Sequence, residues 1–502
     1  MDTTDTATNV SGENREEIMD VLPFVNGEFC SSSTEAYMSS INPSTGEKLC
    51  DVPEGSVRDV DLAVLSSKSA FDERSWVDAP PSHKKMVLHR FGDLIAAEAD
   101  VLDYLDALEM GKPIALGAFS AISAAALMHF YAESIDKLSG THFNSDSTSM
   151  AVQRLVPRGV VAAITPWNFP TYNATMKIAP ALAAGNSVVL KPSELSNQSS
   201  LRIVQLGLDA GLPPGVLNLV PGLGATVGQA LGLHMAVDMI TFTGSTSVGR
   251  HMMQYSGNSN MKAVIAECGG KSPQIVCGDC TDLDIIADNI VQSVTMNQGQ
   301  VCSMGSRLLV ERNIEAKLTE KVLERFEKIA TGEATDPNTS YGPVVTKQQL
   351  NKILAYIESG KEDGADLVCG GDKVNNEKNG NYIKPTAFIN VPETAKIARE
   401  EIFGPVLSVM GFNDTDDAIR LANSTSYGLA AYVWTNDSRK GLKIANNVNT
   451  AVTCLNAAAP AGEGAGHAFS AEPYGMSGTG TEGGMDGLES FCRRHFLWVN
   501  HG

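Results

Sequence analysis

The sequence predicts an α/β protein with two or more domains, each built around a mostly parallel sheet. Its 502 residues exceed what one hydrophobic core of ordinary size accommodates. From Gly159 onward, short β-branched runs alternate with helix-like segments, a pattern typical of parallel strands joined by crossover helices. A hydrophobic fraction of 43% and a charged fraction of 19% are those of a globular chain.

The elements are expected in the following order. Residues 1–20 are polar and acidic and predict a flexible tail without a secretory signal. Residues 60–137 carry apolar residues at helical spacing and predict a helical section. Strands are expected at residues 160–165, 187–190, 216–220 and 239–243, and a second series at 274–276, 307–310, 406–410 and 430–434. Helices are expected at 282–296 and 314–330, and a long loop rich in Gly, Ala and Ser at 457–481.

The charge and the cysteines exclude several classes of function. A net charge of -20 opposes binding to nucleic acid or to anionic membranes, because both need clustered Lys and Arg. The sequence has no apolar run of the roughly 18 to 20 residues that span a bilayer. Nine scattered cysteines do not resemble a disulfide framework and leave at least one thiol free, which favours the reducing cytoplasm.

Cys302 is the candidate nucleophile. It lies in NQGQVCSMG (297–305), where glycines and polar residues precede a β-branched strand, and a tight turn there would leave the sulfur accessible. The alternative is a buried cysteine that only fills space, which fits most of the other eight. Cys277 and Cys280 form a C-x-x-C pair, but the sequence has no second pair and no nearby histidine to complete a zinc site, so no metal is expected.

Glu267 and Asn168 stand where predicted strands give way to loops. Glu267 follows the strand-like run 264–266 and precedes two glycines, a place where α/β proteins put active-site residues. Asn168, in PWNFP (166–170), carries an amide that can donate a hydrogen bond to an oxyanion. A solvated surface glutamate and a turn-capping asparagine are the alternative interpretations.

Three segments have features that suit a dinucleotide. GLGATVG (222–228) has one residue too many for the G-x-G-x-x-G fingerprint. FTGSTSVG (242–249) follows a strand and opens a helix, whose N–H groups and dipole can face a pyrophosphate. KPSE (191–194) places a cation and a carboxylate after a strand, and a carboxylate there favours NAD over NADP because it repels a 2′-phosphate.

In order and spacing, these segments resemble the NAD-dependent, hydrolytic aldehyde dehydrogenases, from about residue 24 to 499. The matching signatures are PWNFP, KPSE, FTGS (242–245), Glu267 before GGKSP, GQVC (299–302) and EEIFGP (400–405). The resemblance implies a Rossmann-like cofactor domain at residues 21–138 and 159–268 and a second α/β catalytic domain at 269–470. It also implies a small β oligomerisation arm at residues 139–158 and 471–502.

The resemblance further implies oxidation of an aldehyde to its carboxylic acid through a thiohemiacetal and a thioester on Cys302. Asn168 and the Cys302 N–H would hold the oxyanion, and Glu267 would activate the hydrolytic water. Lys177 and Glu482 would relay protons. NAD would contact Pro166, Trp167, Lys191, Ser193, Glu194, Gly224, Gly228, Phe242, Thr243, Gly244, Ser245, Glu401 and Phe403.

This sequence departs from the family pattern at two places. Cys268 stands where leucine is common, a small change between apolar residues. The C-terminal pattern P-F-G-G-x-K-x-S-G becomes PYGMSG (473–478), shorter and without the lysine, so the resemblance does not give the shape of the substrate mouth.

The substrate and the assembly are less narrowly defined. AESIDK (132–137) and NQGQVC look most like the amino-aldehyde and semialdehyde subgroups, so an ω-aminoaldehyde or a broad range of aldehydes is expected, with aromatic aldehydes and semialdehydes as alternatives. A CoA-acylating enzyme and a non-catalytic relative are further alternatives, which Glu267 and the joint presence of Cys302 and Asn168 disfavour. The alternating residues 150–156 predict an edge strand that pairs with another subunit of a homodimer or homotetramer.

Overall fold

The first α/β unit is built on an eight-stranded sheet in the order β2-β1-β9-β8-β7-β10-β11-β21. Its five central strands are parallel: β7 (Val160–Ile164), β8 (Ser187–Lys191), β9 (Leu217–Leu219), β10 (Met239–Thr243) and β11 (Ala263–Glu267). The strands expected in these stretches are confirmed. Strand β7 pairs with both β8 and β10, so the strand order reverses at β7. Open α/β sheets bind ligands outside the carboxyl ends of their strands at such a reversal.

Short strands extend this sheet at both edges. They are β1 (Phe24–Val25), β2 (Glu28–Phe29) and β21 (Gly478–Thr479), and a separate hairpin consists of β3 (Tyr37–Ile41) and β4 (Lys48–Pro53). The computed structural model describes residues 18–374, 379–457 and 467–502. Most of the tail expected at residues 1–20 and part of the loop expected at 457–481 therefore lie outside the described residues.

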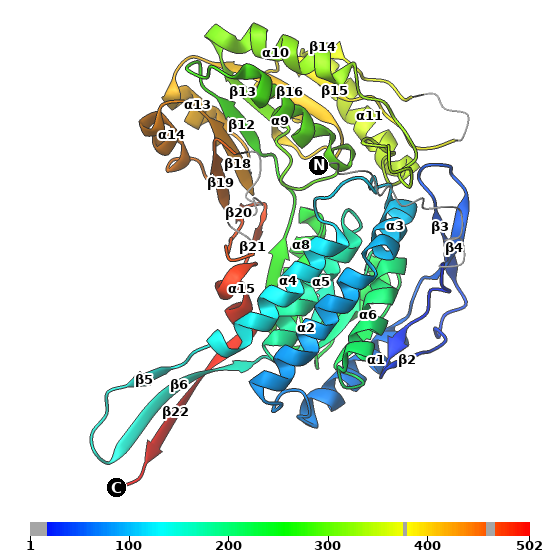
Figure 1. Ribbon diagram of the computed structural model, residues 1–502, viewed down its shortest axis with the longest axis vertical. Coiled ribbons are helices and arrows are strands. Elements are labelled where there is room, and N and C mark those ends of the chain that lie inside the picture. The colour runs from blue at the N-terminus through cyan, green and yellow to red at the C-terminus, as the bar shows by residue number, and fades with distance from the viewer. Residues whose placement is uncertain (1–17, 375–378, 458–466) are drawn as a thin grey trace, which may run out of the picture.

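Helices cover both faces of the first sheet (Figure 1). They are α1 (Val57–Asp72), α2 (Pro81–Ala97), α3 (Ala99–Met110), α4 (Ala121–Ser134), α5 (Pro170–Ala183), α6 (Gln198–Ala210), α7 (Gln229–Leu233) and α8 (Thr246–Gly257). The predicted helical section is confirmed as α1 to α4. Capping explains two of its ends: the Ser56 side chain accepts from the Asp59 N–H at the start of α1, and α3 stops at Gly111 with φ 82°. Helix α4 is apolar on several sides because it packs between α2 and α5.

The second α/β unit has a seven-stranded sheet in the order β14-β15-β16-β13-β12-β18-β19. Six strands are parallel and β14 is antiparallel. The strands are β12 (Pro273–Val276), β13 (Arg307–Glu311), β14 (Asp366–Cys369), β15 (Thr386–Ile389), β16 (Val406–Phe412), β18 (Ala430–Trp434) and β19 (Val452–Leu455). This sheet contains the whole second series of expected strands.

Two hydrophobic clusters cover the faces of the second sheet. One cluster includes residues of α9 (Leu283–Thr295) and α10 (Arg312–Phe326), which are the two expected helices. The other includes residues of α11 (Lys347–Glu362), α12 (Lys396–Arg399), α13 (Thr415–Ala422) and α14 (Ser438–Ala445). Both faces are buried, which is why the strands are almost uniformly apolar.

A three-stranded arm projects away from both units (Figure 1). It consists of β5 (Thr141–Phe143), β6 (Ser149–Pro157) and β22 (Cys492–Asn500), in the order β22-β6-β5. The prediction that residues 150–156 form an edge strand is wrong, because β6 is the central strand and pairs along its whole length with β22. Alternation of polar and apolar residues shows that the two faces of a strand have different surroundings. It does not show whether the strand has one neighbouring strand or two.

The rest of the C-terminal stretch does not belong to the arm. Strand β21 pairs with β11 of the first sheet, and α15 (Gly484–Ser490) packs against α5. Strand β20 (Tyr474–Gly475) pairs with β17 (Tyr427–Gly428). Of residues 471–502, only the part that includes β22 therefore contributes to the sheet of the arm.

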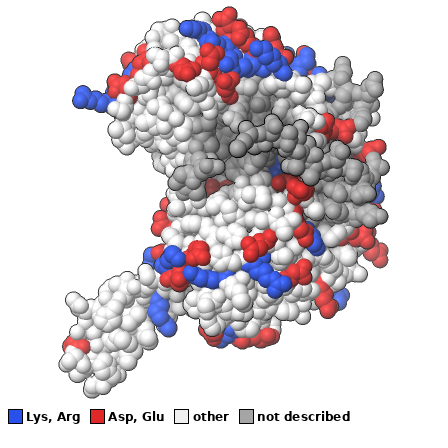
Figure 2. Space-filling view, in the orientation of Figure 1, with Lys and Arg blue, Asp and Glu red and all other residues white. Residues whose placement is uncertain are grey.

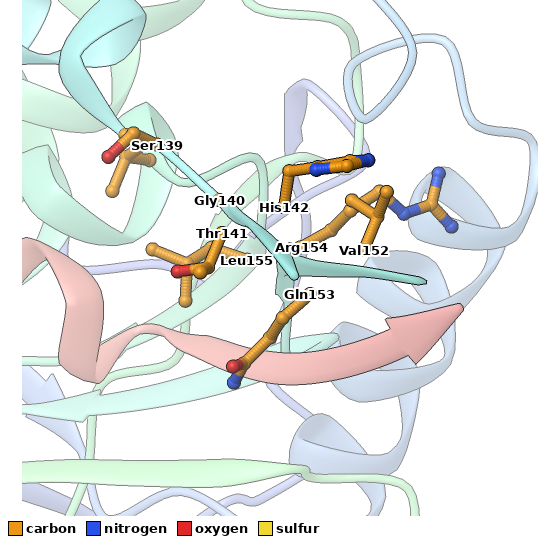
Figure 3. Close-up of a pocket in the computed structure, with 9 residues that line it drawn as sticks. Ser139, Gly140, Thr141, His142, Val152, Gln153, Arg154 and Leu155 are labelled. Carbon is orange, nitrogen blue, oxygen red and sulfur yellow. The ribbon is translucent and has the colours of Figure 1, made fainter. Parts of the chain in front are cut away.

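The visible face carries interspersed acidic and basic side chains on both units, while the arm is largely uncharged (Figure 2). A pocket of about 370 Å³ in the arm is lined by residues 138–142 and 152–155 (Figure 3). None of the expected site residues lines this pocket. In the part of the chain that is described, no helix combines the length and the apolar character needed to cross a bilayer.

Arg307 offers a test of how the second unit is held together. Its buried guanidinium donates to the carbonyl oxygens of Lys271 (2.9 Å), Leu421 (3.0 Å) and Ala422 (2.8 Å). The Arg307→Leu substitution leaves three buried acceptors without a donor, so we expect unfolding in urea to require about 3–5 kcal/mol less free energy. Arg312→Leu, at a side chain that is 60% exposed, is the control and should shift the midpoint little. Equal shifts in the two variants would contradict this account.

Candidate active site

Cys302 lies on a strained turn between α9 and β13. Asn297, Gln298 and Gly299 have φ values of 47°, 54° and 73°, so three consecutive residues adopt the left-handed conformation. Buried amides hold this turn: the Gln300 side chain donates to the Asn297 carbonyl (3.1 Å) and accepts from the Val345 N–H (2.9 Å). The Cys302 side chain is left half-buried beyond the turn.

Asn168 is bonded to the same turn in two directions. The side-chain amide of Asn168 donates to the backbone carbonyl of Gln300 (2.9 Å). The backbone carbonyl of Asn168 accepts from the side-chain amide of Asn297 (2.8 Å). Asn168 is 5% exposed and follows β7, so these bonds link the carboxyl end of the first sheet to the Cys302 turn. A side-chain amide has two N–H groups, which leaves the second able to donate to a ligand.

Glu267 ends β11, and the two glycines after it allow the backbone to approach Cys302. A Cβ on Gly270 would lie 2.3 Å from the carbonyl oxygen of Cys302, a distance that no side chain tolerates. Strand β21 covers the end of β11, where Glu267 pairs with Gly478. Although PYGMSG departs from the family pattern, its Ser477 carbonyl accepts from the Cys268 N–H (2.8 Å) and keeps this end of the strand in place.

A buried charge cluster lies beside Glu267. Lys177 of α5 is fully buried and donates to the carboxylate of Glu482, which the C-terminal stretch supplies. Burial, and then the Glu482 charge, raise the pKa of Glu267 well above its ordinary value, while Lys177 acts in the opposite direction. A carboxyl group with a raised pKa is a stronger base when it is ionised, which suits proton abstraction.

The surroundings of Cys302 disfavour its thiolate form and raise its pKa. Burial, then the carboxylates of Glu401 and Glu267, raise its pKa to about 12, against the effect of the Ser303 and Cys302 backbone N–H groups. The protein without ligands therefore holds this group as a thiol at neutral pH. Attack on a carbonyl carbon requires a base to remove its proton.

The reversal of strand order at β7 places two expected cofactor segments side by side. Pro166 and Trp167 follow β7, while Thr243 ends the neighbouring β10 and Gly244 follows it. The hydroxyl of Thr243 is buried without a hydrogen-bond partner among the described residues. Exposed Ser245 caps α8, a helix of 12 residues, so free N–H groups of its first turn face outward beside that hydroxyl.

Lys191, the last residue of β8, lies close to Glu194 in the connection that follows the strand. The Lys191 ammonium is buried, donates to the Pro192 carbonyl (2.7 Å) and lies 3.7 Å from the Glu194 carboxylate. Burial lowers the pKa of Lys191, which the Glu194 charge opposes. The Ser193 hydroxyl accepts from the Leu195 N–H (3.3 Å) and shapes this turn.

Gly224 and Gly228 leave space for a ligand in the connection after β9, and Gly228 lies near the Lys191 side chain. A Cβ on Gly228 would lie 3.9 Å from the Lys191 side chain, and no described atom lies within 4 Å of a Cβ on Gly224. A cation, a carboxylate, a helix N-terminus and backbone without side chains thus gather at one end of the sheet. These groups fit a dinucleotide, which needs partners for ribose hydroxyls and for a pyrophosphate.

The second unit contributes Glu401 and Phe403 to the same region. Glu401 accepts from the Gly270 N–H (3.1 Å), and the Phe403 ring meets Trp167 edge to face at 5.3 Å between centroids. Phe403 has a φ of 58°, which is unusual for a bulky residue. Phe242 differs from the others: it is 3% exposed and packs under Gly244, so it supports the turn from inside.

The structure also adds Phe119, which the sequence did not point to. Its ring packs against Phe169 and Tyr172 next to the Cys302 turn. No local signal could have identified it, because Phe119 lies in an irregular connection between α3 and α4 and reaches the turn only in the folded chain. Across the described residues, no group of three or more His, Cys, Asp or Glu side chains is arranged to hold a metal ion.

The raised pKa of Cys302 can be tested by alkylation. In the protein without ligands, the rate of Cys302 alkylation by iodoacetamide should rise about tenfold per pH unit from pH ~7 to ~9.5, because the thiolate fraction is still increasing throughout that range. Free cysteine, with a pKa of about 8.5, should level off in the same experiment. Glu401→Gln should speed the reaction at pH ~8, since it removes the larger of the two charges that raise the pKa. Mass spectrometry of the Cys302 peptide measures the rate, and a plateau at the position of free cysteine would contradict the assignment.

Comparison with known proteins is consistent with this geometry. Residues 29–497 match the model of the aldehyde dehydrogenase family. A protein called aldehyde dehydrogenase from Enchytraeus buchholzi is 41% identical over 481 residues, which cover 95% of each chain.

Two solved structures are similar over the whole molecule. One is a mutant of the indole-3-acetaldehyde dehydrogenase AldA from P. syringae in complex with NAD+ and IAA, with a TM-score of 0.93, 39% identity and coverage of 97% of this chain and 98% of that one. The other is a gamma-glutamyl-gamma-aminobutyraldehyde dehydrogenase from Burkholderia cenocepacia J2315, with the same TM-score of 0.93, identity of 39% and coverages of 97% and 98%.

Proposed function

The chain belongs to the aldehyde dehydrogenase family, and from this premise we propose that Cys302 carries the oxidation of an aldehyde to its carboxylic acid, with NAD as cofactor. The family makes the protein an oxidoreductase that acts on aldehydes. The observation that supports the assignment best is the convergence of Cys302, Asn168 and Glu267, which come from three separate segments.

In the first step, the Cys302 sulfur attacks the aldehyde carbon. The new C–S bond displaces the carbonyl π electrons onto oxygen, and the resulting oxyanion accepts hydrogen bonds from the second N–H of Asn168 and from the Cys302 backbone N–H. Glu267 removes the thiol proton, directly or through a water, because the pKa of the thiol is too high for spontaneous ionisation.

When bound, the nicotinamide supplies the acceptor for the hydride that leaves the thiohemiacetal carbon. The chain's own residues hold the rest of the cofactor. Lys191 and Glu194 would bind ribose hydroxyls, with Ser193 shaping their turn, while Ser245 and the α8 N-terminus would bind the pyrophosphate. Glu401 and Phe403 would position the nicotinamide side, and the open backbone at Gly224 and Gly228 would admit the adenosine side.

The thioester left on Cys302 is then hydrolysed. Glu267 takes a proton from a water as the water oxygen bonds to the thioester carbon. The C–S bond then breaks with its electron pair leaving on sulfur, so the acid is released and the Cys302 thiolate, which takes up a proton, returns to its starting state. Lys177 and Glu482 would carry the proton from Glu267 toward the surface, since buried Lys177 pairs with the partly exposed Glu482 and both charges act on Glu267.

The proposed nucleophile and base can be separated by substitution. We expect Cys302→Ala to lower kcat at least ~1,000-fold and Glu267→Gln to lower it ~100- to 10,000-fold. The Glu267→Gln protein should also accumulate a thioester on Cys302, because hydrolysis is the step that lacks its base. NADH formation and intact-protein mass spectrometry measure the two effects, and Glu47→Gln at an exposed glutamate is the matched control. Activity that survives in Cys302→Ala, or a CoA ester as the product when CoA is present, would refute the proposal.

The preference for NAD rests on Glu194. A carboxylate beside the ribose repels the 2′-phosphate of NADP. The Lys191 ammonium lies near the Glu194 carboxylate and is therefore not free to pair with that phosphate. We expect Glu194→Gln to raise the ratio of kcat/KM for NADP to that for NAD about tenfold, with the exposed Glu47→Gln unchanged. An unaltered ratio in both variants would show that another group selects the cofactor.

Four classes of aldehyde fit this reaction: ω-aminoaldehydes, as expected from the sequence, and aliphatic, aromatic and semialdehydes. We further propose a cytoplasmic homodimer or homotetramer, divided into the cofactor domain and the catalytic domain expected above and an arm that consists of β5, β6 and β22. The support for the location is nine free cysteines, and the support for the assembly is the exposed Phe143, Phe496 and Trp498 on the arm.

A further inference from the structure

An apolar cluster with three aromatic rings lies beside the Cys302 turn. Its buried part consists of Phe169, Val301 and Met304, each at most 6% exposed. Leu116, Phe119, Tyr172 and Met296 pack against these three and are partly exposed. Val301 directly precedes Cys302, and Phe169 directly follows Asn168. Both groups proposed to act on the aldehyde carbon therefore adjoin the cluster, and the tail of a bound aldehyde has this surface within reach.

The three rings form one continuous aromatic surface. The Phe119 centroid lies 4.5 Å from that of Phe169 and 5.0 Å from that of Tyr172, with the second pair edge to face at 77°. Phe119 is the ring that joins the other two.

The backbone of Phe119 is held in a strained conformation to present this ring. Its φ is 55°, a left-handed value that is an outlier for a bulky side chain. Such strain persists only where the surroundings impose it, and it gathers at ligand-binding positions. Here the connection is fixed on both sides of Phe119: the Ile114 N–H donates to the Ala334 carbonyl (2.8 Å), and the Ala121 N–H donates to Asp103 (3.1 Å).

The three described segments that supply the cluster offer no unpaired charge to the tail. The three segments that supply the cluster, residues 111–120, 169–183 and 296–304, contain two charged residues, Lys112 and Lys177. Lys112 is buried and paired with Asp103 (3.0 Å), and Lys177 is buried and paired with Glu482. A cationic or anionic tail would leave water without gaining an ion pair from these segments.

We propose that Phe119 is a specificity-determining residue and that the cluster selects aldehydes with an uncharged apolar tail, aryl above all, over ω-aminoaldehydes and semialdehydes. The inference rests on the proposed function of Cys302. An aryl tail gains both apolar burial and edge or face contacts with the rings. An ammonium tail gains a cation–π contact but must lose its hydration shell in return.

A substrate panel with the wild-type protein tests the selectivity. The probes are phenylacetaldehyde, hexanal, 4-aminobutanal and succinate semialdehyde, with acetaldehyde as an aldehyde that has no tail. We expect kcat/KM for phenylacetaldehyde to exceed that for 4-aminobutanal and for succinate semialdehyde at least ~10-fold, within the range that pocket contacts provide. A preference for either charged aldehyde would overturn the proposal.

Substitution of Phe119 tests the residue itself. Phe119→Ala should lower kcat/KM for phenylacetaldehyde about tenfold, mainly through KM, and leave acetaldehyde within about threefold. Phe119→Leu should restore part of the loss, because it replaces apolar volume. Tyr37→Ala, at an aromatic residue that is 52% exposed on β3, is the control for the loss of a ring elsewhere.

The outcomes separate this inference from the proposed function. If acetaldehyde is oxidised by the wild type and not by Cys302→Ala, the function stands whatever the panel shows. If Phe119→Ala lowers kcat/KM for phenylacetaldehyde and acetaldehyde equally while its thermal unfolding matches the wild type, Phe119 does not determine specificity and the inference fails.

Discussion

The pair of hydrogen bonds between Asn168 and the Cys302 turn is the contact on which the arrangement of the site depends. The Asn168 side chain of the first unit donates to the Gln300 carbonyl of the second unit. In the other direction, the Asn297 side chain donates to the Asn168 carbonyl. Buried bonds of this kind cannot be exchanged for water, so breaking either would leave a polar group unsatisfied at a cost of about 1–3 kcal/mol. They therefore fix the distance between the sulfur and the side chain proposed to hold the oxyanion, and they help to offset the strain of three left-handed residues in succession.

Burial is the main cause of the raised pKa values of Cys302 and Glu267. In water, Cys302 would be partly ionised near neutral pH and Glu267 would be a weak base. In the folded chain the pKa of both groups is raised, first by burial and then by neighbouring carboxylates. The proton affinity of the proposed base is therefore closer to that of the thiol it would ionise, which is the condition for efficient proton transfer. Lys177 and the partly exposed Glu482 form the ion pair that is proposed to connect this carboxyl with the surface.

The last part of the chain has a larger role than its distance from the other motifs suggests. Residues 473–482 return to the first sheet, where Gly478 pairs with Glu267 and Glu482 meets Lys177. The Ser477 hydroxyl also accepts from the Gly428 N–H of the second unit (2.9 Å). This segment thus keeps the end of β11 in place despite its shortened sequence. Its neighbours at residues 458–466 lie outside the described part of the chain.

The sequence by itself determined the elements and the chemistry-bearing residue types. Local sequence placed β7 to β13, β16 and β18 and the helices α1 to α4, because local spacing decides whether a segment buries one face or two. It did not place β14, β15 or β17. The candidates Cys302, Glu267 and Asn168 stood out because each follows a predicted element and lies near glycine, proline or an aromatic residue. The resemblance to a family then assigned their roles, which geometry alone would have left among several chemistries.

Only the tertiary structure decided which distant residues meet. Phe119 joins Phe169 and Tyr172 through a connection without regular structure, and no spacing rule relates them. The position of β6 in the middle of the arm depends on β22, a strand more than 300 residues away in the chain. Burial, the raised pKa values and the strain at Phe119 and Asn297 arise from packing between segments. Local sequence specifies a segment's own conformation, but contacts between segments depend on the whole chain. The proposed substrate surface is made of such contacts.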